Sequence, residues 1–161
     1  MSDLPADILR RLRPIPTTTG PPTTAPRDIV GTDLWGMPCT VEVLGSAAPV
    51  LLLFLSAGCT GCRDLWEGLA ALRDGLGPRA RLAVITKGEE AEDAAALRAL
   101  VGVDGPPAGV AVVLSSTAWS HYRVAGPPFM ALADAQRVRM EGVAWGLDET
   151  LRAALIAVGE G

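Results

Sequence analysis

Short apolar runs of strand length alternate along this chain with segments whose apolar residues recur at helical spacing. Residues 50–55 form an unbroken apolar run, which is typical of a strand buried on both faces of a sheet. An alternating segment at 37–44, after a turn at 33–36, predicts an earlier strand. The remaining runs that predict strands lie at 81–86, 110–114, 129–133 and 138–143.

Helical spacing is clearest after the first apolar run. Leu65, Leu69, Leu72 and Leu76 fall at positions i, i+4, i+7 and i+11, and they predict one helix that ends at Gly77-Pro78. Further helices are predicted at 7–13, 89–101 and 147–158.

This order of elements predicts an α/β fold in which helices flank a central mixed β-sheet. Strands alternate with helices until a late hairpin, whose turn lies at 134–136, and a closing helix. The Pro/Thr-rich stretch at 14–26 has no periodicity. We therefore expect a flexible N-terminal segment at 1–26 and a single domain at 27–161, a size that suits one core.

Composition narrows the partners that the chain can have. The 14 Lys and Arg residues against 18 Asp and Glu residues give a net charge of -4, which argues against nucleic acid as a partner. The start has no apolar leader region, and the longest apolar run is far shorter than the ~20 residues that span a bilayer. We expect a monomer without a membrane span in the cytoplasm, or in the periplasm or another extracytoplasmic space if a leader or anchor has been removed.

The candidate chemistry lies in Cys59-Thr60-Gly61-Cys62, between a buried strand and a helix start. A cysteine there meets unpaired backbone N–H groups and the positive end of the helix dipole, which both favour the thiolate. Its pKa can then fall from ~8.5 toward ~3.5–7.5. We assign Cys59 as the attacking thiol and Cys62, one turn later and deeper, as the resolving thiol. Thr60 and Gly61 are expected to tune the redox potential, because each alters the donors that face Cys59.

Two other interpretations of this pair stay open. A zinc site needs two further ligands, and only Cys39 and His121 are available, far apart in the sequence. The pair could also be inert, because cysteine is among the most buried residue types. Cys39 is most simply a small buried hydrophobic residue. His121 is expected to be a surface histidine, with proton donation near the dithiol as its alternative role.

The aromatic and charged residues around the motif have plainer interpretations. Trp66 and Trp119 are expected to pack in the core, with the edge of a peptide-binding surface as the alternative. Arg63 is expected to be solvated or to add positive potential beside Cys62. The acids at 89–93 are expected to form a solvated helix start that the helix dipole stabilises.

The segment LLLFLSAGCTGCRDLWEGL resembles the strand–CxxC–helix of the thioredoxin superfamily, and residues 122–129 (YRVAGPPF) resemble its V-x-G-x-P-T segment. The resemblance implies a thioredoxin-like fold with a cis-proline at Pro128. It also implies that the loop of Gly126, Pro127 and Pro128 lies against the CxxC and binds the substrate chain. A cis X-Pro bond is otherwise a minority state, at about 5–6% of such bonds in folded proteins.

Within the superfamily, an extra strand–helix insertion at 81–114 and the opening at 31–36 are similar to TlpA-like or MauD-like members. Gly58 stands where thioredoxins carry a tryptophan, and Leu53 stands where they carry a buried acid, which argues against a general thioredoxin reductant. A peroxiredoxin is disfavoured because it would need Thr in place of Ser56 and Pro in place of Leu52.

Together these residues predict a thiol–disulfide oxidoreductase that exchanges a Cys59–Cys62 dithiol or disulfide with a protein partner. It would need no cofactor and no metal beyond this pair, and another protein would donate or accept its electrons. The alternative is a redox-inert interaction module with the same fold.

Overall fold

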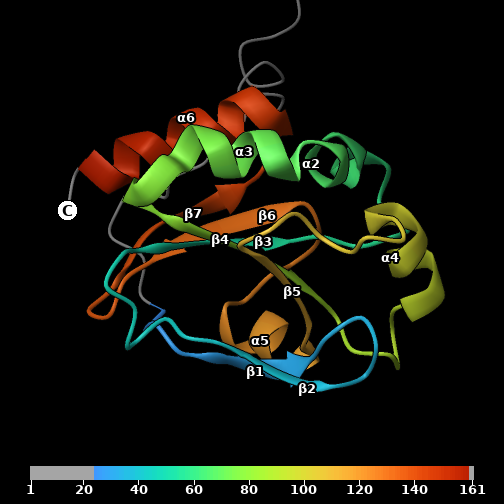
Figure 1. The fold of residues 1–161 in the computed structure, drawn as a ribbon. Coiled ribbons are helices and arrows are strands. Elements are labelled where there is room, and N and C mark those ends of the chain that lie inside the picture. The colour runs from blue at the N-terminus through green and yellow to red at the C-terminus, as the bar shows by residue number, and fades with distance from the viewer. Residues whose placement is uncertain (1–23, 160–161) are drawn as a thin grey trace, which may run out of the picture.

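The computed structural model describes residues 24–159, and seven strands of this part form one sheet (Figure 1). The strands are β1 (Ile29–Thr32), β2 (Pro38–Val41), β3 (Val50–Phe54), β4 (Arg81–Thr86), β5 (Val110–Leu114), β6 (Phe129–Ala133) and β7 (Val138–Val143). The α-helices are α2 (Arg63–Glu67), α3 (Leu69–Leu76), α4 (Ala94–Val101), α5 (Ser116–His121) and α6 (Gly146–Gly159), and short 3-10 turns are η1 (Thr60–Cys62) and η2 (Gly77–Arg79).

The predictions for the N-terminal region fall largely outside this part of the chain. The segment 1–26 is described only at 24–26, which form neither helix nor strand, and the predicted helix at 7–13 lies wholly outside. Across residues 24–159, none of the helices combines the length and the apolar character that a bilayer crossing requires.

The sheet is mixed, as the sequence predicted, with the strand order β2-β1-β5-β4-β3-β6-β7. β3, β4 and β5 run parallel to one another, whereas β6 and β7 extend the sheet antiparallel on one side. β1 pairs antiparallel with both β2 and β5 on the other side. The insertion predicted at 81–114 is the unit β4–α4–β5.

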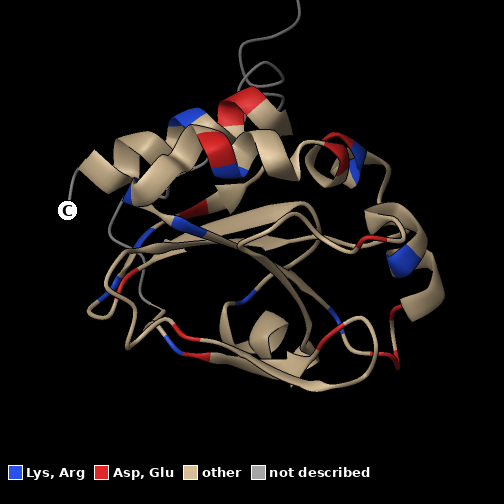
Figure 2. Ribbon diagram, viewed as in Figure 1, with Lys and Arg blue, Asp and Glu red and all other residues tan. Residues whose placement is uncertain are grey.

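Two apolar clusters cover the two faces of the sheet. In Figure 1, α2, α3 and α6 lie above the central strands, and α5 lies below them beside β1 and β2. β3 contributes to both clusters, because Leu51 and Leu53 pack toward the first while Val50, Leu52 and Phe54 pack toward the second. All five side chains are fully buried, which confirms the prediction for this run. Figure 2 shows that the central strands carry almost no Lys, Arg, Asp or Glu, which agrees with their burial.

Two of the predicted helices begin or end differently in the structure. The helix expected to run from the CxxC to Leu76 is broken at Gly68, where an added Cβ would lie 2.8 Å from a Leu147 methyl and 2.9 Å from the Asp64 carbonyl oxygen. The helix predicted at 89–101 begins only at Ala94. The Asp93 carboxylate caps it by accepting hydrogen bonds from the N–H groups of Ala95 and Ala96.

No signal in the sequence was strong enough to predict β1 and α5. α5 is six residues long and starts at the Ser115 cap. β1 is four residues long and contains Gly31, where a Cβ would overlap the Leu114 carbonyl group of β5. Glycine at this position lets β1 approach β5 closely, but it also weakens the strand pattern.

We therefore expect Gly31→Ala to destabilise the fold, because backbone must move to admit the methyl group. Overpacking of this kind costs about 1–3 kcal/mol. The measurement is the free energy of unfolding from urea titration. Gly58→Ala is the matched control, because a Cβ at Gly58 meets nothing within 4 Å, and it should change stability by less than about 0.5 kcal/mol. Equal stability of the two variants would contradict the close approach of β1 to β5.

Asp28, just before β1, ties that strand to the segment after β2. Its Oδ1 accepts hydrogen bonds from the N–H groups of Leu44 at 2.9 Å and Val43 at 2.7 Å. These two hydrogen bonds lower the pKa of Asp28 below its usual 3.8, and the bond from Leu44 has the larger effect. Because the folded pKa is lowered, the stabilisation is complete above pH 3.8 and is lost as the pH falls through the folded pKa.

Asp28→Asn keeps an oxygen acceptor but cannot take up a proton there. We expect the free energy of unfolding of this variant to fall less steeply than that of the unchanged protein below pH 3.8. Urea titrations at pH 7 and at several values below 3.8 measure the difference. Parallel pH curves would show that Asp28 does not couple protonation to folding.

Candidate functional site

The Cys-x-x-Cys segment lies where β3 ends and the helices of the upper layer begin. Cys59 and Cys62 form a disulfide, with their Cα atoms 5.3 Å apart. Cys62 is completely buried and Cys59 is partly exposed, while Thr60 and Gly61 between them are exposed. Cys59 is therefore the residue of the pair that solvent can reach, and Cys62 is covered by the core.

The helical environment of Cys59 is shorter than the sequence indicated. Cys59 precedes the 3-10 turn η1, and the Cys62 N–H donates a hydrogen bond of 3.2 Å to the Cys59 carbonyl oxygen. α2 follows with five residues before the break at Gly68. Helix charge effects are concentrated in the first turn, and the first turn after Cys59 is the three-residue η1.

A loop distant in the sequence lies against this segment. The Pro127–Pro128 peptide bond is cis, as the resemblance implied. A Cβ on Gly61 would lie 3.6 Å from Cδ of Pro128, so the proline ring is in contact range of the turn between the two cysteines. Gly126, Pro127 and Pro128 are all partly exposed, and the Ala144 N–H donates to the Pro128 carbonyl oxygen at 3.2 Å.

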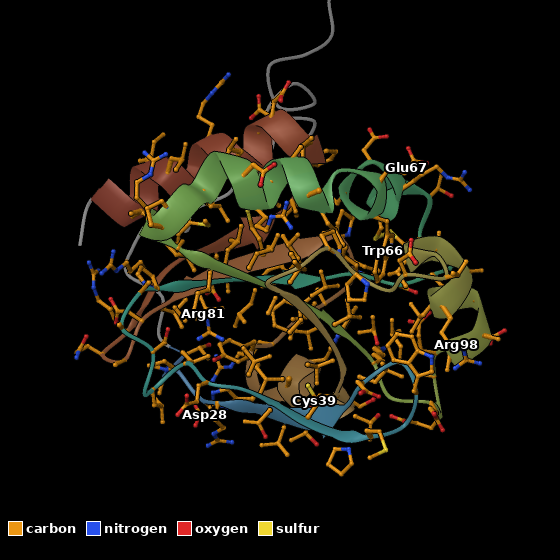
Figure 3. The ribbon with its side chains drawn as sticks, in the orientation of Figure 1. Asp28, Cys39, Trp66, Glu67, Arg81 and Arg98 are labelled. Carbon is orange, nitrogen blue, oxygen red and sulfur yellow. A yellow bond between two sulfur atoms is a disulfide. The ribbon has the colours of Figure 1, made fainter. Side chains whose placement is uncertain are left out.

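Ser56 and Ala57, two of the three residues before Cys59, are held by two side chains from distant parts of the chain. The indole Nε1 of Trp66 donates to the Ser56 carbonyl oxygen at 3.2 Å. A carboxylate oxygen of Glu92 accepts from the Ala57 N–H at 2.9 Å and from the Ser56 hydroxyl at 3.3 Å. Trp66 is buried between α2 and α4, as Figure 3 shows, so the prediction that it packs in the core is confirmed.

Glu92 is the residue of this site that sequence reasoning missed. It was expected to be a solvated acid at a helix start, but it lies before α4 and binds the loop that leads to Cys59. A usable signal was present, because Glu92 follows β4, and the carboxyl ends of the parallel strands β3 and β4 meet at one edge of the sheet.

Two positions depart from the thioredoxin pattern, and the structure shows what stands there in place of the buried acid and the tryptophan. Leu53 is fully buried in the apolar core. Gly58 leaves open space, since a Cβ there would meet nothing within 4 Å. Ser56 and Leu52 stand where a peroxiredoxin would need Thr and Pro.

The structure does not bring Cys39 or His121 to the cysteine pair. Cys39, on β2, packs toward the lower cluster. Burial is the main cause that raises the pKa of its thiol, and the negative charge of Asp33 adds to it. The ring Nε2 of His121 lies 2.7 Å from the Ala25 carbonyl oxygen, and the ring packs against Tyr122. Within residues 24–159, His, Cys, Asp and Glu side chains form no group of three or more that could hold a metal ion. Trp119 is buried, as predicted.

No protein-family model and no curated protein matches this sequence. Solved structures do match it. A DsbE-type thiol:disulfide interchange protein from Chlorobium tepidum, described as putative, is 16% identical, with a TM-score of 0.66 over 88% of this chain and 100% of that one. A secreted disulfide oxidoreductase from Mycobacterium tuberculosis is also 16% identical, with a TM-score of 0.61 over 83% and 96%.

A peroxidoxin, BcpB, from Mycobacterium tuberculosis is 18% identical, with a TM-score of 0.62 over 85% of this chain and 96% of that one. These matches establish a thioredoxin-like fold, as the sequence predicted. They include more than one chemistry, so the fold by itself does not identify the reaction.

Glu92 gives a direct test of how the loop before Cys59 is held. Glu92→Ala removes the acceptor of the Ala57 N–H, and we expect this amide to exchange its hydrogen roughly fivefold faster, as for the loss of one net hydrogen bond of about 1 kcal/mol. Glu92→Gln keeps an oxygen acceptor and should retain most of the protection. The measurement is hydrogen–deuterium exchange of the peptide that contains Ala57.

Glu89→Ala is the control, because Glu89 is an exposed acid on the same loop. It should leave the exchange of Ala57 unchanged. Unchanged exchange in Glu92→Ala as well would mean that the carboxylate does not restrain the loop.

Proposed function

We propose that this protein is a thiol–disulfide oxidoreductase whose Cys59–Cys62 pair exchanges electrons with a protein partner. The observation that carries the proposal is the unequal burial of two bonded cysteines beside the loop of Gly126, Pro127 and Pro128. An accessible sulfur can react with a partner, and a buried sulfur one turn away can then displace that partner.

In the reducing direction, the Cys59 thiolate attacks one sulfur of a partner disulfide. A bond forms between Cys59 and the partner, while the partner's second sulfur leaves as a thiolate and takes up a proton from solvent. Cys62 then loses its proton and attacks the sulfur of Cys59. The Cys59–Cys62 bond closes, the partner's first sulfur leaves as a thiolate, and two electrons have passed to the partner. Oxidation of a partner dithiol follows the same steps in reverse.

The neighbouring residues support the same assignment. Gly126, Pro127 and Pro128 are proposed to bind the partner strand, because they are partly exposed and Pro128 lies against Gly61. Thr60 and Gly61 are proposed to tune the potential, since they separate the two sulfurs and form the turn η1 that follows Cys59. The chemistry needs no cofactor beyond the dithiol.

The described functions of the neighbours agree in part with this proposal. The Chlorobium tepidum protein is described as a putative thiol:disulfide interchange protein and the Mycobacterium tuberculosis protein as a disulfide oxidoreductase. The peroxidoxin would favour peroxide reduction, but Ser56 and Leu52 depart from that pattern.

The compartment and the monomeric state stay predictions. The cytoplasm is the first expectation from the sequence, with the periplasm or another extracytoplasmic space as the alternative. The Mycobacterium tuberculosis oxidoreductase, which is described as secreted, supports the alternative.

The proposal is tested by equilibrating the protein with glutathione buffers of graded redox potential and counting free thiols. We expect one reversible two-electron transition that is lost in Cys59→Ser and in Cys62→Ser. In the reduced protein, iodoacetamide should modify Cys59 well before Cys62, since Cys62 is completely buried.

Cys39→Ser is the matched control, and it should leave the transition in place. If the thiols of Cys59 and Cys62 react only after denaturation, the oxidoreductase is wrong and the redox-inert interaction module is the better description.

A further inference from the structure

A groove leads away from Cys59 between α2 and α4. A pocket of about 150 Å³ is lined by Cys59, Arg63, Trp66 and Leu100, among others. A second pocket of about 540 Å³ shares the Trp66 and Leu100 walls and continues to Pro106. Because Trp66 and Leu100 line both pockets, the two lie next to each other, and we call them together the α2–α4 groove.

Two apolar side chains, Trp66 and Leu100, form the middle of this groove, and charged residues line it on either side. Trp66 is buried and hydrogen-bonded to the loop before Cys59, and Figure 3 shows it between α2 and α4. Leu100 of α4 faces it with 38% of its surface exposed. Gly58 adds no side chain at the Cys59 end, so the pocket beside the sulfur stays open.

The charges along the groove change sign with distance from Cys59. Arg63 lines the pocket at Cys59, whereas Glu67 and Asp104 line the larger pocket beyond it. Among residues 24–159 the three salt bridges join other residues, so none of these charges is neutralised by an ion pair in the described part. A bound chain with an acidic residue near Arg63 and a basic residue near Glu67 and Asp104 would neutralise the charges at both ends of the groove.

The spacing of these charges matches an extended polypeptide. Arg63 and Glu67 are four residues apart on α2, which is about 6 Å along a helix. Two residues of an extended chain span about 6.6 Å and place their side chains on the same side. The residue between them faces the opposite wall, where Leu100 lies.

We propose that the α2–α4 groove binds an extended segment of the protein partner that carries an acidic, an apolar and a basic residue in succession, with the acidic residue nearest the reactive cysteine. The acid pairs with Arg63, the apolar side chain covers Leu100, and the base pairs with Glu67 and Asp104. This inference rests on the proposed thiol–disulfide exchange, and it adds which partner sequences the protein favours.

The test uses Cys62→Ser with thionitrobenzoate bound to Cys59 as a mixed disulfide. The thiolate of an added peptide attacks the sulfur of Cys59, a Cys59–peptide bond forms, and coloured thionitrobenzoate leaves, with no net oxidation. The peptides place Glu-Leu-Lys or Lys-Leu-Glu beside a single cysteine. Each is made with the cysteine at either end, so that both chain directions are covered.

Of the two possible positions of cysteine, before or after the three residues, one should fit the groove. For that position, we expect the peptide with Glu next to cysteine to react about fivefold faster than the peptide with Lys next to cysteine. The ratio should approach one at 0.5 M NaCl, because salt screens exposed charges. The ratio of the two rates is the readout, since any general effect of Arg63 on Cys59 cancels in it.

The paired reversal Arg63→Glu with Glu67→Arg should invert the preference. Arg137→Glu is the control for charge, because Arg137 is exposed in the β6–β7 turn, and it should leave the preference unchanged. Equal rates for all peptides, or a preference that survives the paired reversal, would overturn the groove proposal but leave the exchange chemistry standing.

Two other outcomes would contradict either the proposed exchange chemistry or the proposed occupant of the groove. Failure of every peptide to displace thionitrobenzoate would overturn the proposed function itself. If sedimentation shows a dimer that the paired reversal dissociates, a second copy of this chain occupies the groove, and the partner proposal is wrong.

Discussion

The position of the cysteine pair depends on the burial of β3 on both of its faces. Full burial of a Val, Leu or Phe side chain contributes about 1.5–3 kcal/mol, and every residue of Val50–Phe54 is fully buried. β4 on one side and β6 on the other fix the register of this strand. A slip by one residue would exchange the two faces of the strand, so the register fixes where the chain leaves β3 toward Cys59.

The same strand pairing gathers the rest of the site. β6 begins directly after Pro128, and its pairing with β3 brings the proline loop to Gly61. β4, parallel to β3, ends on the same edge and delivers the segment that contains Glu92. The site therefore lies where β3 and β4 end and β6 begins, while the β4–α4–β5 unit supplies the outer wall of the α2–α4 groove.

Most of the sheet and the cysteine pair could be predicted from the sequence, because continuous apolar runs and the strand–CxxC–helix order are local signals. The errors arose where distant contacts decide the structure. Gly68 interrupts a regular leucine stripe because Leu147 packs against it, and β1 depends on the close approach of Gly31 to β5. Glu92 could not be assigned from its acidic neighbours, because its partners, Ser56 and Ala57, lie on another strand's loop.

The late place of β6 in the chain has a consequence during synthesis. About 70 residues separate Cys59 from the start of β6, which takes roughly 4–14 s to make at about 5–20 residues per second. Until then the nascent chain lacks the strand that completes the site, although Cys39, Cys59 and Cys62 have all been made. The completed sheet then packs Cys39 toward the cluster opposite to that of Cys59 and Cys62. The finished sheet thus separates Cys39 from the other two sulfurs.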